Sequence, residues 1–520
     1  MSGRTAPRSR TGCSTCRTRK VKCDEERPCC SRCRSAQLSC DWVRPPRRQR
    51  PKPAKPDRLA ALQVVQQRRV LLPRDAFGLS TSQQLRNSLR LSSMDREYLV
   101  YFPNTIVVAW VGKPWKWGLL RYLYSSVASE SPVVMRLMLA LSASELETRR
   151  SMDPDRIRWS LPCQPGTGVA HYSAALREFR SELERSRRQP LSQEKLDEII
   201  AAFFFLISYE HHFGGGWSGL NTHLSGMYAF LKSCGVLGDL SSKPEVDMAV
   251  SSKNLLLYIM YIALSHAWGG TDERETWLRA MDNDTFCDFI DCLFLESRDT
   301  NSIIFRGEYP TEELADDISV YHPLDFFHEC SKLKHRLLSY IRDVKDGKEP
   351  ETSTKFLLSE LKRIGKRFRN LVMLGQREDP PIRLRELQTI YSVVGEYHAL
   401  EIVCHRAICI PQAGGRRPAC HRDALANVLG VCRKMMKRNP RVMVRLIWPL
   451  VVAAESVDDA DDKRWIQETV ETVRRDTGSS SWLAEGLDDI WASPACPQQL
   501  TGSLSPRIPR AGTISAISDV

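Results

Sequence analysis

Six cysteines near the N-terminus constrain this chain more than any other feature of its 520 residues. They spell the triplet C-x2-C-x6-C twice, and every cysteine of the second triplet follows its counterpart after 17 residues. The two triplets are Cys13, Cys16, Cys23 and Cys30, Cys33, Cys40. Thiolates at such spacing are typical of structural zinc sites, so we expect a zinc-binding module here.

The number of sulfur atoms predicts the number of ions. Two tetrahedral Zn2+ ions need eight thiolate positions, and six cysteines supply eight only if two of them bridge both ions. A cluster of two zinc ions and six cysteines therefore satisfies the count. Such a cluster carries a net charge of about −2, which neighbouring Arg and Lys side chains offset.

Four cations lie directly after the first C-x2-C, before the third cysteine. The same loop therefore carries candidate metal ligands and cations that can bind DNA phosphates. The four are Arg17, Arg19, Lys20 and Lys22. The whole segment reads GCSTCRTRKVKCD at residues 12–24, with Pro28 and the last three cysteines after it. It resembles the DNA-binding domain of fungal zinc binuclear cluster transcription factors. In that family the first and fourth cysteines bridge the metals, which implies this role for Cys13 and Cys30.

The resemblance also implies how the module would meet double-stranded DNA. It places the short helix after Cys16 in the major groove, with Arg19 and Lys20 at base edges. Arg and Lys most often contact guanine there, so a CGG-like half-site is expected. Arg17 and Lys22 flank this pair and are expected to hold phosphates.

Other arrangements of these cysteines remain open. Three disulfides would suit a secreted protein, but the residues after Met1 are polar and basic rather than a secretory signal. A single zinc on C-x2-C-x13-C-x2-C would leave Cys23 and Cys40 unexplained. Cys29 adjoins Cys30, and the C-x2-C spacing selects Cys30 as the ligand and leaves Cys29 spare.

Positive charge is concentrated beside the cysteines. Residues 1–60 hold 17 Lys or Arg and 5 Asp or Glu, a net charge of +12, whereas the whole chain carries +13. The remaining 460 residues are therefore almost neutral. Attraction to a polyanion such as DNA is predicted to come from the first 60 residues.

A basic linker follows the cysteines. Residues 41–58 contain five prolines and seven basic residues, which predicts an extended cationic segment that also suits nuclear import. A short helix is expected at 59–72, where many relatives dimerise through a coiled coil. This stretch has at most two heptads, fewer than a stable seam needs, so the sequence leaves homodimer and monomer open.

The rest of the chain reads as helical. Ser131 and Pro132 predict one helix start and Ser192 another. The apolar run 255–268 has 14 residues, too few to cross a bilayer, so a buried helix and no membrane partner are expected. Alternating strand patterns are scarce. The predicted fold is mainly α: a small two-zinc cluster and a large all-α domain.

Weak motifs in the helical region resemble, in their order, the regulatory domain of one subgroup of these fungal regulators. They are residues 140–144, 171–172, 216–217, 223–226 and 448–455. The resemblance implies a helical platform for co-regulators or transcription machinery and for a small-molecule effector. Acidic and aromatic residues at 482–491 resemble an activation segment by composition, and a closing amphipathic helix explains them equally well.

No catalytic constellation stands out, so an enzyme is not expected. Gly214–Gly216 lacks the Lys and Ser/Thr of a phosphate-binding loop, and Glu210-His211-His212 is not H-E-x-x-H. His223 is expected to be a core or capping histidine. A group of cysteines and histidines between residues 404 and 421 lacks the spacing of metal ligands. We therefore expect its cysteines to be buried and its histidines to be hydrogen-bonded. Its members are Cys404, His405, Cys409, Cys420 and His421.

These patterns together predict a nuclear, zinc-dependent, sequence-specific transcription factor for RNA polymerase II genes. The alternative is a zinc-stabilised interaction scaffold that binds nucleic acid without sequence preference. The expected segments are a basic arm (1–12), the zinc cluster (13–41), the linker (42–90), the regulatory domain (91–492) and a disordered tail (493–520).

Overall fold

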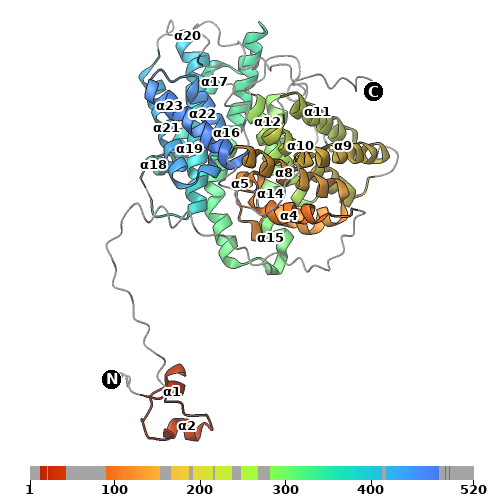
Figure 1. Ribbon diagram of the computed structural model, residues 1–520. Helices are drawn as coiled ribbons and strands as arrows, with labels where there is room; N and C mark the ends of the chain where they lie inside the picture. The colour runs from red at the N-terminus through yellow and green to blue at the C-terminus, as the bar shows by residue number, and fades with distance from the viewer. Residues whose placement is uncertain are drawn as a thin grey trace. The chain divides into compact units, whose positions relative to one another are not determined.

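The chain forms two compact units, Met1–Gln83 and Gln84–Val520. The computed structural model describes residues 12–19, 21–42, 89–152, 165–186, 191–214, 217–236, 248–267, 282–378, 380–412, 417–478, 487 and 491. Throughout these ranges the regular elements are helices and no strand occurs (Figure 1), which confirms the predicted fold class. The expected linker helix at 59–72 and the tail at 493–520 lie outside the described residues.

Among the residues that the structure describes, two short helices lie in the first unit and the other helices lie in the second. The first two are α1 (Ser14–Thr18) and α2 (Ser31–Ser35). The first half of the second unit holds α4 (Ser93–Tyr101), α5 (Ile106–Val111), α6 (Leu119–Tyr122), α7 (Ala128–Glu130), α8 (Pro132–Met152), α9 (Thr167–Ser186), α10 (Gln193–Phe213), α11 (Trp217–Ser233), α12 (Val250–Ala267), α14 (Asn283–Ser297) and α15 (Thr300–Phe305). Its second half holds α16 (Thr311–Lys345), α17 (Thr354–Arg367), α18 (Arg369–Gln376), α19 (Leu384–Cys404), α20 (Ile410–Gln412), α21 (Ala419–Arg438), α22 (Ile447–Ala454) and α23 (Ala460–Thr477).

Side-chain caps start several of these helices where the sequence predicts. The Ser192 hydroxyl accepts a hydrogen bond from the backbone N–H of Lys195 and caps α10. The Ser131 hydroxyl accepts one from Val134 N–H at 3.3 Å, at the start of α8. Each cap satisfies a backbone donor that the first helical turn leaves without a partner. The predicted starts of both helices are therefore confirmed.

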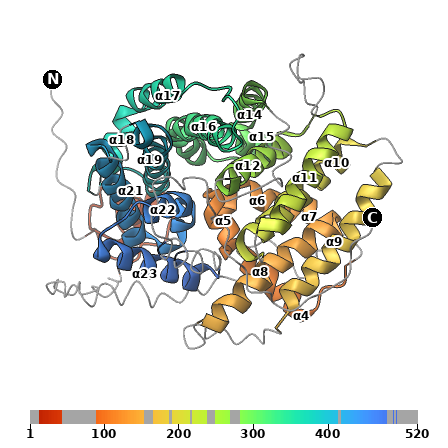
Figure 2. The same cartoon turned by 90° about the horizontal axis from the view of Figure 1, so that it is seen from above.

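The described residues of the second unit form two hydrophobic cores. Helices α4 to α14 enclose one, and α17 to α23 enclose the other, on opposite sides of the unit in Figure 2. The 35-residue helix α16 contributes to both, with Leu338 in the first core and Phe326 and Leu333 in the second. Burial of these apolar faces supplies the main stabilisation of the unit. Polar contacts also join elements that contribute to the two cores.

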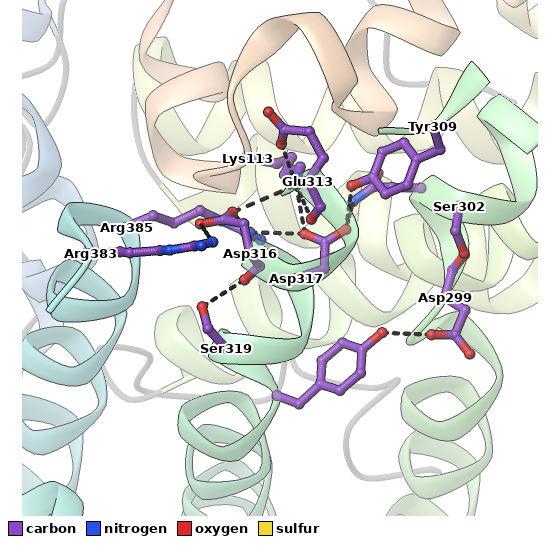
Figure 3. Close-up of polar contacts among 12 residues, drawn as sticks. Lys113, Asp299, Ser302, Tyr309, Glu313, Asp316, Asp317, Ser319, Arg383 and Arg385 are labelled. Carbon is purple, nitrogen blue, oxygen red and sulfur yellow. Dashed lines mark hydrogen bonds and ion pairs between the residues drawn. The ribbon is translucent and has the colours of Figure 1, made fainter. Parts of the chain in front are cut away.

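One of these polar contacts is a buried cluster of charges, drawn in Figure 3. Lys113, which is 4% exposed, contacts Asp317 at 2.7 Å, Glu313 at 2.9 Å and Asp316 at 3.6 Å. Arg385 of α19 contacts Asp317 at 2.8 Å and also pairs with Asp316. Burial acts to raise the pKa of Asp317, but these cations hold it below its usual value. The cluster joins the end of α5 to α16 and α19.

Gly112 brings Lys113 into that cluster. It ends α5 with φ +82°, the left-handed conformation that glycine adopts most readily. A Cβ at this position would overlap the guanidinium of Arg445, whose Nη2 donates to the carbonyl of Ala109 at 2.7 Å. The turn therefore needs glycine both for its backbone conformation and for the space.

We expect Gly112→Ala to lower the free energy of unfolding by about 2–3 kcal/mol, through backbone strain and displacement of Arg445. Gly166→Ala is the matched control, because Gly166 has the same φ of +82° but no neighbour within 4 Å of an added Cβ. Urea denaturation of both variants separates strain from overlap. Equal losses in the two variants would mean that contact with Arg445 contributes nothing.

Two residues beyond α23 pack onto the second core. Leu487 is 2% exposed, and the indole N–H of Trp491 donates to the carbonyl of Ala454 at 3.0 Å. Both belong to the acidic and aromatic stretch that resembles an activation segment by composition. Their packing favours the other interpretation, a segment that closes the helical domain.

Candidate metal centre

The two C-x2-C segments fold into matching turns. The backbone N–H of Cys16 donates to Cys13 Sγ at 3.4 Å, and that of Cys33 donates to Cys30 Sγ at 3.4 Å. The next turn is also the same in both halves. The backbone N–H of Val21 donates to the carbonyl of Cys16 at 3.1 Å, and that of Leu38 donates to the carbonyl of Cys33 at 3.0 Å. The sequence repeat is therefore also a structural repeat.

Six sulfur atoms converge between these turns in two overlapping groups of four. The first group is Cys13, Cys16, Cys23 and Cys30, and the second is Cys13, Cys30, Cys33 and Cys40. Within each group all sulfurs lie within 4.8 Å of one another. Cys13 and Cys30 belong to both groups, so they occupy the positions from which a sulfur can reach two ions.

The distances between sulfurs suit zinc better than disulfides. Cys13 Sγ lies 3.8 Å from Cys30 Sγ, 3.7 Å from Cys33 Sγ and 3.9 Å from Cys23 Sγ. A tetrahedral site with Zn–S bonds of about 2.3 Å has sulfurs about 3.8 Å apart, whereas a disulfide bond is about 2.05 Å long. All cysteines among the described residues are free thiols.

The pKa values of the two shared cysteines shift in the opposite direction from those of Cys16 and Cys33. Burial acts to raise the pKa of Cys13 and Cys30, but hydrogen bonds from the N–H groups of Cys16 and Cys33 hold both pKa values below the ordinary one. Burial raises the pKa of Cys16 to about 12 and also raises that of Cys33.

Cys29 stays outside the cluster, as the spacing predicts. It is half-buried, and its Sγ faces the backbone carbonyl of Cys30 at 3.8 Å. Neither group of four sulfurs includes it. Cys23 and Cys40, which a single-zinc arrangement would leave unused, each complete one group.

Two aspartates that the sequence analysis missed hold the repeats together. Asp24 accepts a hydrogen bond from Ser31 N–H at 3.0 Å, and the carbonyl of Asp41 accepts one from Ser14 N–H at 2.7 Å. The Oδ2 of Asp41 also accepts from the Ser14 hydroxyl at 3.1 Å. Each aspartate follows the last cysteine of its triplet and binds the helix start of the other triplet. The 17-residue period relates both serines and both aspartates, so it could have identified this exchange.

The four predicted DNA-binding residues lie on and after α1. Arg17 belongs to α1, and Arg19 follows its end with an exposed side chain. Lys22 is also exposed, and it immediately precedes Cys23. Lys20 and the side chain of Arg17 lie outside the described part of the chain. Exposed cations thus adjoin the sulfur cluster on the segment that the resemblance assigns to the major groove.

The helical unit positions His223 as a structural residue. Its Nε2 lies 2.7 Å from Tyr172 Oη, which also bonds Glu210. Burial lowers the pKa of His223 to about 4, so the ring is neutral. His223 is thus a partly buried histidine, 15% exposed, whose partner Tyr172 belongs to α9.

Sequence comparisons match two families on this chain. Residues 11–50 match the fungal Zn(2)-Cys(6) binuclear cluster domain, and residues 118–497 match the fungal specific transcription factor domain. Both are domains of DNA-binding transcription regulators rather than of enzymes. The sequence matches no curated protein and no solved structure.

Across the residues that the structure describes, the helices lack the length and apolar character that crossing a bilayer requires.

The second match spans residues 118–497, which is more than half of the chain, and the first adds the cysteine cluster. The chain therefore belongs to the fungal specific transcription factor family and carries a fungal zinc binuclear cluster domain at its N-terminus.

Proposed function

We propose that this protein is a nuclear, zinc-dependent, sequence-specific regulator of transcription by RNA polymerase II. The observation that carries the proposal is the pair of overlapping four-sulfur groups beside exposed cations. Two Zn2+ ions would occupy these groups, with Cys13 and Cys30 bridging and the other four cysteines terminal. Zinc would fold residues 13–41, because structural zinc contributes about 10–16 kcal/mol in small finger peptides.

The basic residues would divide the work of DNA recognition. Arg19 and Lys20 would donate to guanine O6 and N7 in the major groove and select CGG-like half-sites. Arg17 and Lys22 would hold phosphates and fix the orientation of the helix. The net charge of +12 on residues 1–60 supports this assignment, since the rest of the chain is nearly neutral. The helical domain would then serve co-regulators, an effector or a second copy of the chain.

We expect Lys20→Ala and Lys22→Ala to change DNA binding in different ways, the first through sequence preference and the second through overall affinity. Loss of a base contact at residue 20 should relax base preference and cost about 1–3 kcal/mol on the preferred site. Loss of a phosphate contact at residue 22 should weaken binding to all duplexes alike and reduce the salt slope by about one. Fluorescence anisotropy on matched and mismatched duplexes, at several salt concentrations, measures both quantities. Equal losses of specificity in the two variants would contradict this division.

Selection from random duplex DNA tests the proposal as a whole. The full chain is used with zinc and again after chelation, at one fixed salt concentration. Enrichment of CGG-like sites only with zinc supports a sequence-specific regulator, and one or two half-sites per duplex distinguishes monomer from dimer. Zinc-independent recovery without a consensus would instead support the interaction scaffold.

A further inference from the structure

A second group of sulfur and imidazole ligands lies in the helical unit, far along the chain from the zinc cluster. Helix α19 continues into a π-helical turn, His405–Cys409, which packs near the start of α21. Cys420 Sγ lies 3.4 Å from His405 Nε2. The rings of His405 and His421 have centroids 5.9 Å apart. Single π-helical turns are frequent at functional sites.

His421 is buried without any hydrogen-bond partner. It is 1% exposed, and both of its ring nitrogens lack a partner, as does Nδ1 of His405. Other buried histidines of the described residues are bonded, for example His328 to Tyr261 and Asp291 and His335 to Asn283. A buried polar group without a partner costs about 1–3 kcal/mol, so a ligand bound by His421 would offset part of this cost.

The residue types suit a cation. His405 begins the π-helical turn that Cys409 ends, and Cys420 and His421 lie in the first turn of α21. Two sulfurs and two imidazoles form a ligand set typical of Zn2+.

One pair of donor atoms has the spacing of a zinc site, but the four donors do not yet converge on one point. In a tetrahedral site an S and an N ligand lie about 3.5 Å apart, and Cys420 and His405 are separated by a similar distance. No three of the four donor atoms lie within 4.8 Å of one another, in contrast to the six-cysteine cluster. Binding would therefore require side-chain rotation. Cys420 is exposed, which leaves a path for an ion from solvent.

We propose that His405, Cys409, Cys420 and His421 form a second site for Zn2+, in the regulatory domain. An ion there would link the π-helical turn after α19 to the start of α21. It would also give one of the two unpartnered ring nitrogens of His421 a partner. Stability of the helical domain would then depend on zinc independently of the N-terminal cluster. This proposal does not rest on DNA binding.

Cys420→Ser in the full chain tests the site, with Cys234→Ser as the control because Cys234 is exposed and lies outside it. After zinc loading and dialysis, mass spectrometry of the metal should find one zinc fewer per chain in Cys420→Ser than in the wild type and the control. Chelation should lower the thermal midpoint of the helical domain in these two proteins and leave Cys420→Ser unchanged.

His421→Leu gives a second readout, since leucine fills the volume without needing hydrogen bonds. It should weaken zinc binding at this site at least about tenfold and lower metal-free stability little or not at all. The N-terminal cluster is intact in every variant, so its metal content cancels in each comparison. Equal zinc content and equal zinc-induced stabilisation in wild type and Cys420→Ser would overturn the proposal.

Discussion

Cys13→Ser should remove metal from both halves of the N-terminal cluster and abolish DNA binding. Cys13 belongs to both four-sulfur groups, so its loss leaves each group with three sulfurs. Serine binds zinc poorly, and the metal supplies most of the folding free energy of such small modules, about 10–16 kcal/mol. Metal content, circular dichroism and duplex binding of the full chain measure the effect. Cys30→Ser should behave in the same way, because Cys30 is the other shared residue.

Cys29→Ser is the matched control for these variants. Cys29 is the direct neighbour of Cys30, yet neither sulfur group contains it. We expect its replacement to leave metal content and DNA affinity unchanged. If Cys13→Ser retained the metal stoichiometry and DNA affinity of the wild type, the bridging role of Cys13 would be wrong.

The cysteine pattern can be recognised in the sequence because its information is local. A period of 17 residues selects six cysteines, and the structure brings those six together while leaving Cys29 aside. The same period also relates Asp24 to Asp41, whose contacts with the opposite repeat went unrecognised. Closely spaced cysteines can be recognised from residue type and spacing, whereas hydrogen bonds between repeats depend on how the halves pack.

Helix starts in the large domain are likewise local and were predicted at Ser131 and Ser192. Contacts between distant segments were not. Lys113 meets Asp317 across 204 residues, and neither lies in a motif. The unpartnered His421 is also a product of packing, because the sequence favours a hydrogen-bonded core histidine there. The contacts of these charged groups and imidazoles depend on their burial. The burial of any one side chain follows from the whole fold and cannot be predicted from neighbouring residues in the sequence.

A second long-range contact of this kind centres on Glu145. This carboxylate on α8 is fully buried. Its Oε1 accepts hydrogen bonds from Tyr101 Oη at 2.8 Å and Arg441 Nη2 at 2.7 Å, and its Oε2 accepts one from Ile106 N–H at 2.6 Å. Arg441 lies in the 3-10 turn Pro440–Leu446, 296 residues after Glu145 in the sequence. Glu145 therefore joins α4 and α5 to the C-terminal half through one charged group.

Glu145→Gln keeps the volume of this side chain but removes its charge and turns one acceptor into a donor. The amide would face either Arg441 or the N–H of Ile106, and both are donors, so one hydrogen bond must be lost. Removing one partner of a buried ion pair costs about 3–5 kcal/mol, and we expect the helical domain to lose that much stability.

Glu184→Gln is the matched control, because Glu184 pairs with Arg180 on the surface of α9 with both side chains more than half exposed. Surface pairs contribute about 0–1 kcal/mol, so this variant should unfold at nearly the wild-type urea concentration. Urea denaturation followed by circular dichroism compares the two substitutions in one domain. A loss in Glu145→Gln no larger than in Glu184→Gln would show that the buried charge of Glu145 contributes nothing to the association of the two halves.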